Sequence, residues 1–97
     1  MINWLQHWYI DQCDGDWEHE NGIKIETADN PGWIINIDLV GSKLEGLEIP
    51  YTLIEKSNNT WFGYSITNNV FKGACSPTEL NTLIEAFKKV YESKEAR

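Results

Sequence analysis

The sequence has no long apolar run, few bases in its first half, and no cysteine pair at metal-ligand spacing. Its apolar stretches are too short to cross a membrane, and its N-terminal residues predict no signal peptide. The two cysteines, Cys13 and Cys75, stand far apart and predict reduced, mostly buried thiols in a cytoplasmic protein. The length predicts a single domain over residues 1–97.

The motifs that usually identify an enzyme are also missing. The sequence contains no glycine-rich phosphate loop, no serine nucleophile elbow and no paired histidines. Cys75 precedes a predicted helix, where the helix dipole lowers the pKa of a thiol. A thiol enzyme also needs backbone amides around its anion, yet Pro77 has no amide hydrogen and the only arginine is Arg97. We therefore expect a protein that is not an enzyme and has no cofactor, with a small hydrolase or thiol enzyme as the disfavoured alternative.

Acidic residues are abundant and unevenly distributed. Residues 1–50 carry ten acids against two lysines, a net charge of −8, whereas residues 51–97 carry five acids against six bases, a net charge of +1. A field of this sign repels nucleic acid and anionic lipid and attracts basic partners. The charge therefore argues against nucleic-acid and membrane binding and favours a basic protein partner.

Five carboxylates fall within the ten residues 11–20, with no lysine or arginine among them. Clustered carboxylate oxygens suit Ca²⁺ or Mg²⁺, so a metal loop is one alternative. An EF-hand loop that begins at Asp14 would need a glycine at position six and a glutamate at position twelve, where this sequence has His19 and Ile25. A metal site is therefore not predicted. A solvated surface and an acidic surface that binds a protein stay open.

Hydrophobic periodicity predicts a helix at each end of the chain and about five strands between them. The expected segments are a helix over 3–13, a hairpin over 17–27, strands over 33–39, 51–55 and 61–67, a fifth or edge strand over 70–75, and a C-terminal helix. The last helix is predicted to begin with a capping box at Ser76-Pro77-Thr78-Glu79. Asn30-Pro31-Gly32 predicts a type II turn. The fold class is α+β: an antiparallel meander with both helices packed on one face.

Burial decides the register of the predicted hairpin. A two-residue turn would put glutamates on the apolar face, so a three-residue loop over 20–22 is expected. The inward face then consists of Trp17, His19, Ile23 and Ile25. The outward face carries Glu18, Lys24 and Glu26. His19 is thus expected to be a core histidine rather than a general base or a metal ligand.

Several segments resemble one known family. They are Trp4-Leu5, Trp8-Tyr9, Gln12-Cys13-Asp14-Gly15-Asp16-Trp17-Glu18-His19, Gly22-Ile23-Lys24-Ile25, Asp29-Asn30-Pro31-Gly32-Trp33 and Ile37-Asp38-Leu39. Over residues 4–39 the chain resembles the bacterial immunity protein 53 family. The resemblance continues more sparsely at Trp61, at Phe71-Lys72-Gly73 and in the closing helix.

This resemblance implies a toxin antidote that binds and inhibits a cognate polymorphic toxin, such as a nuclease, in a stoichiometric complex. A protein-interaction module with another partner is the alternative. Charge and strand face, rather than the resemblance, suggest where the partner binds. The candidate residues are Asp11, Asp14, Asp16, Glu18, Glu20, Glu26 and Asp38.

Overall fold

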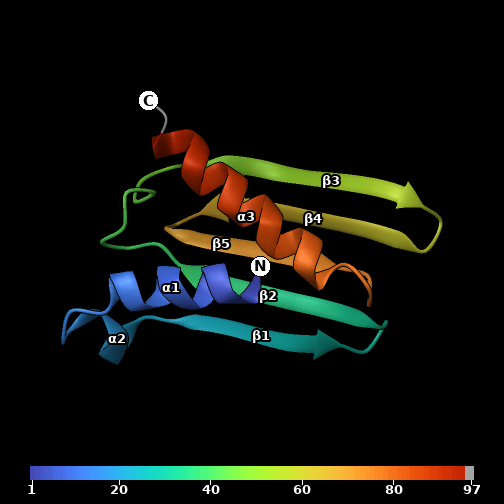
Figure 1. The fold of residues 1–97 in the computed structure, drawn as a ribbon. Helices are drawn as coiled ribbons and strands as arrows, with labels where there is room; N and C mark the ends of the chain where they lie inside the picture. The colour runs from blue at the N-terminus through green and yellow to red at the C-terminus, as the bar shows by residue number, and fades with distance from the viewer. Residues whose placement is uncertain (96–97) are drawn as a thin grey trace.

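A computed structural model describes the backbone of residues 1–95 and the side chains of residues 1–93. Its elements, in chain order, are α1 (Ile2–Gln12), α2 (Trp17–Glu20), β1 (Ile23–Ala28), β2 (Gly32–Asp38), β3 (Ile49–Ser57), β4 (Thr60–Thr67), β5 (Val70–Cys75) and α3 (Leu80–Glu95). The five strands form one antiparallel sheet, and α1 and α3 lie side by side on the same face of it (Figure 1). The predicted α+β class is confirmed.

The strand order is β1-β2-β5-β4-β3, which differs from a simple meander at one connection. After β2 the chain crosses to the opposite edge and makes β3, and β4 and β5 then lead back towards β2. Residues 39–48 form this crossing and are anchored by Leu44, which is completely buried. The predicted strand 70–75 is therefore central rather than an edge strand. Its inward residues Phe71, Gly73 and Cys75 are all buried, as a strand paired on both sides requires.

The core lies between the sheet and the two long helices. Trp8 of α1 and Phe87 of α3 meet edge to face, with ring centroids 5.2 Å apart. Gly73 lets α3 approach the sheet, because a Cβ at this position would lie 2.8 Å from the side chain of Leu83. The alternation predicted for β2 is confirmed, since Ile35 and Ile37 are fully buried on this face.

Residues 17–20 form the short helix α2 instead of the first strand of a hairpin. Trp17 is buried as predicted, but His19 is exposed and is not a core histidine. Ile25 shares the helix-facing side of β1 with Ile23, yet it is 37% exposed because β1 is an edge strand. The outward direction predicted for Glu26 is confirmed, because it alternates with Ile25 along β1.

Two predicted backbone motifs take other forms. The Ser76 hydroxyl accepts a hydrogen bond from the Trp61 amide at 3.1 Å and does not cap α3, which begins at Leu80. The carboxylate of Glu79 pairs with Lys56 at 2.6 Å instead of closing a capping box. The turn before β2 is not type II, because the Asn30–Pro31 peptide is cis and Gly32 does not have a positive φ.

Candidate protein-binding site at the acidic end

Hydrogen bonds between side chains and backbone shape the acidic segment between α1 and β1. One carboxylate oxygen of Asp14 accepts hydrogen bonds from the amides of Asp16 and Trp17, both at 2.9 Å. The carboxylate of Glu18 reaches back and accepts from the amides of Asp14 and Gly15 at 2.9–3.2 Å. This reciprocal arrangement is a variant of the capping box, and it explains why the segment turns into a helix rather than a strand.

Both capping carboxylates are held in the charged form. The amides of Trp17 and Asp16 lower the pKa of Asp14. The pKa of Glu18 is lowered first by the backbone amide of Glu18 itself and then by the amides of Asp14 and Gly15. These two predicted site residues therefore have a structural role, and their charge persists in mildly acidic solution.

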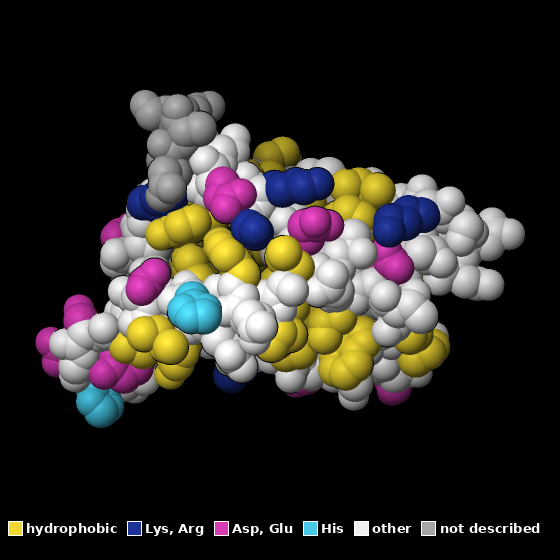
Figure 2. Space-filling view, in the orientation of Figure 1, with side chains coloured by type: hydrophobic (Ala, Val, Ile, Leu, Met, Phe, Trp, Pro, Cys, Tyr) yellow, Lys and Arg dark blue, Asp and Glu magenta, His cyan; other side chains and the backbone are white. Residues whose placement is uncertain are grey.

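Three of the other predicted acids project into solvent at the same end of the molecule. Asp11 ends the exposed side of α1, and Asp16 and Glu20 flank α2. Within residues 1–93, their carboxylates make no hydrogen bond or ion pair. Acidic side chains gather at this end in the space-filling view (Figure 2). Within the described side chains, none of these three carboxylates is therefore paired with a lysine.

The last two predicted residues lie on the sheet face that has no helix. Asp38 accepts a hydrogen bond from the Gly22 amide at 2.9 Å and fixes the start of β1. A hollow of about 480 Å³ brings Asp38 together with Glu20, His19 and Lys24. Glu26 does not line this hollow and stands farther along β1. The structure therefore groups six of the seven residues around the α2 end and leaves Glu26 apart.

Trp17 attaches this acidic end to the core. Its indole nitrogen donates to the carbonyl oxygen of Val40 at 2.8 Å, and its ring meets Trp8 and Tyr9 edge to face at 6.2 and 6.0 Å. The side chain is only 8% exposed. Because Trp17 lies between Asp16 and Glu18 in sequence, its burial fixes the positions of both neighbours.

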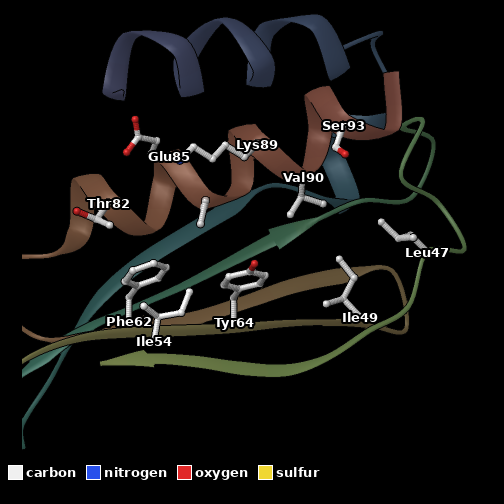
Figure 3. A pocket seen from close by; sticks show the side chains of 11 residues that line it. Leu47, Ile49, Ile54, Phe62, Tyr64, Thr82, Glu85, Lys89, Val90 and Ser93 are labelled. Carbon is white, nitrogen blue, oxygen red and sulfur yellow. The ribbon is translucent and has the colours of Figure 1, made fainter. Parts of the chain in front are cut away.

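Two apolar hollows lie at the opposite edges of the sheet, and sequence reasoning identified neither. One, of about 390 Å³, lies between α1 and β1 and is lined by Ile2, Leu5, Gln6, Tyr9, Gly22, Ile23 and Ile25. The other, of about 450 Å³, lies between α3 and the strands β3 and β4 (Figure 3). In the sequence, Tyr9 of the first hollow lies two residues before Asp11, but apolar spacing alone does not indicate that its side chain is exposed.

Comparison with protein families gives a match over residues 2–92 to the family model for immunity protein 53. The chain belongs to this family. The match includes the acidic segment, all five strands and every residue that lines the two apolar hollows except Ser93. Comparisons with curated proteins and with solved structures give no significant match.

In this immunity protein 53 chain, Cys75 lies in surroundings unlike those of a nucleophilic thiol. Cys13 and Cys75 are both free, as predicted. Burial raises the pKa of Cys75 to about 11, opposite to the lowering that a nucleophilic thiolate needs. Within residues 1–93, no group of three His, Cys, Asp or Glu side chains could hold a metal ion, and no helix within residues 1–95 is long and apolar enough to cross a membrane.

Proposed function

We propose that this chain is a toxin-neutralising immunity protein that acts in the cytoplasm without catalysis. It binds the basic surface of a cognate polymorphic toxin domain, such as a nuclease, and blocks that domain in a stoichiometric complex. The observation that carries the proposal is membership of the immunity protein 53 family. The partner surface is the acidic end formed by Asp11, Asp14, Asp16, Glu18, Glu20 and Asp38, with Glu26 at its margin.

Uncompensated charge supports this choice of surface. The carboxylates of Asp11, Asp16 and Glu20 have no partner among the described residues and stand at one end of the molecule. Exposed charges of one sign accelerate the encounter with an oppositely charged partner, by about 10-fold to 1000-fold in favourable cases. Rapid capture suits an antidote, because a free toxin acts as soon as it is present.

The experiment measures association kinetics with the purified toxin domain encoded beside the chain's own gene. Asp16→Lys/Glu20→Lys spares the capping carboxylates, so the variant should fold normally. We expect its association rate at low salt to fall by about 10-fold, and wild-type association to slow as salt rises.

Asp29→Lys/Glu92→Lys is the matched control, because it changes the net charge equally at exposed positions away from α2. We expect the control to slow association far less. Equal slowing by both variants would assign the effect to total charge, and unchanged rates in the first variant would mean that the acidic end is only a solvated surface. A toxin domain that does not bind the wild-type chain at all would refute the proposed function.

A further inference from the structure

The hollow between α1 and β1 is an exposed apolar groove. Ile2, Tyr9 and Ile25 line it and are 47%, 37% and 37% exposed. None of its lining residues carries a charge. Apolar side chains gathered in a concave surface of this kind are typical of binding sites rather than of freely solvated surface.

The groove is continuous with the acidic end. Gly22 and Ile23 line both this groove and the hollow that contains Glu20 and Asp38. Tyr9 also links the two regions, because its ring packs edge to face on the ring of Trp17 in α2, with the ring centroids 6.0 Å apart. The groove on the helix-facing side of β1 and the hollow with Glu20 and Asp38 on the opposite sheet face therefore meet at the start of β1.

This arrangement defines the chemistry of the occupant. An apolar groove beside an excess of carboxylates over lysines fits an apolar side chain that is flanked by lysine or arginine on the partner. Buried apolar anchors surrounded by polar groups carry most of the binding energy at protein interfaces. Surrounding charges act mainly on the association rate, whereas anchors act mainly on the dissociation rate.

The other apolar hollow does not have this combination. Its α3 side carries one acid, Glu85, and one base, Lys89, which balance each other (Figure 3). The hollow that adjoins the α1–β1 groove has two acids, Glu20 and Asp38, against Lys24. It also lies at the β3 edge, across the sheet from the acidic end. Charge complementarity therefore selects the α1–β1 groove for a basic partner and gives no reason to select the hollow at β3.

We propose that the groove between α1 and β1 is the anchor pocket of the toxin interface and takes an apolar side chain from a basic segment of the toxin domain. This inference rests on the proposed function. Ile2→Thr/Ile25→Thr makes the groove more polar with a small loss of side-chain volume. Ile2 is the exposed first residue of α1, and Ile25 lies in β1, where threonine is well tolerated. With the same toxin domain as probe, we expect the dissociation rate to rise at least about 10-fold and the association rate to change less than about twofold.

Leu53→Thr is the matched control, since Leu53 is 49% exposed and lies on β3 at the opposite edge. It should leave both rates within about twofold of wild type. Thermal unfolding of each variant checks folding, and Ile25→Thr alone, at a single exposed position, repeats the test with the smallest structural change.

The outcomes separate the two proposals. The groove variants could dissociate like wild type while Asp16→Lys/Glu20→Lys still slows association. In that case the groove is not the anchor pocket, and the proposed function stands. Faster dissociation in Leu53→Thr alone would place the anchor at the β3 edge and overturn this inference. If the wild-type chain does not bind the toxin domain, the proposed function fails and the anchor fails with it.

Discussion

Both edge strands of the sheet, β1 and β3, expose apolar side chains, but the surroundings of these side chains differ. At the β3 edge, Tyr51 and Leu53 are exposed, but the strand pairing is irregular at both ends and Pro50 cannot donate a hydrogen bond. Lys56 near the end of β3 is paired with Glu79. Such features discourage the addition of another strand. The β3 edge therefore exposes apolar side chains beside balanced charge.

The β1 edge is shorter and has its own helix pair beside it. Its apolar groove adjoins a hollow in which carboxylates outnumber the one lysine, Lys24, and two further carboxylates hold α2 in place. The comparison teaches that similar apolar exposure can occur beside balanced charge or beside an excess of carboxylates. Under the proposed function, only the β1 edge fits a basic partner.

The largest effect is expected from removing the residue that attaches the acidic end to the core. Trp17→Ala should lower the free energy of unfolding by about 3–5 kcal/mol, because a buried indole and its contacts are lost. Trp61→Ala is the comparison, since Trp61 is half-buried on the face without helices, and about 1–2 kcal/mol is expected there. Urea unfolding followed by circular dichroism measures both. Equal losses would mean that Trp17 is no more important to the fold than a surface tryptophan.

The two thiols should differ in reactivity by about 100-fold or more. At pH 8 a thiol with a pKa of about 11 is ionised in roughly one molecule in a thousand, and Cys75 is also only 1% exposed. Cys13 is partly exposed near the acidic end. Alkylation with iodoacetamide, read by mass spectrometry, should therefore label Cys13 in the folded protein and both cysteines after unfolding. Rapid labelling of Cys75 in Cys13→Ser under native conditions would contradict its burial.

The smallest effect is expected on stability at acidic pH, through the ion pair between Lys56 and Glu79. Lys56 lowers the pKa of Glu79 from its ordinary value of 4.5. A carboxyl group whose pKa is lower in the folded state stabilises the fold above its unfolded pKa, and this stabilisation disappears as the pH falls through the folded value. In Lys56→Met the main cause is gone, so the variant should lose less stability than wild type as the pH is lowered from about 5.

Urea unfolding at pH 7, 5 and 3.5 tests this expectation. Asp14 and Glu18 keep their lowered pKa in both proteins, so both should still lose stability in acid. Identical pH slopes in wild type and Lys56→Met would show that the ion pair does not contribute.

Local patterns predicted much of the fold. The strand expected over 33–39 corresponds to β2, and the range expected for the last strand, 70–75, matches β5 residue for residue. The register argument for residues 17–27 was wrong because it considered only strands. The carboxylates of Asp14 and Glu18 make a helical turn there by bonding to nearby amides, and a pattern of apolar residues does not report such bonds.

Sequence by itself determined the charge asymmetry, the composition of the core and the number and type of the main elements, because these depend on residue identity and on spacing along the chain. It also carried the family resemblance, which the match over residues 2–92 confirmed. Only the tertiary structure decided which strands are edges, which carboxylates are bonded and where apolar residues meet the acids. These features depend on long-range pairing, above all on the crossing from β2 to β3 that makes β5 central and leaves β1 with one neighbour.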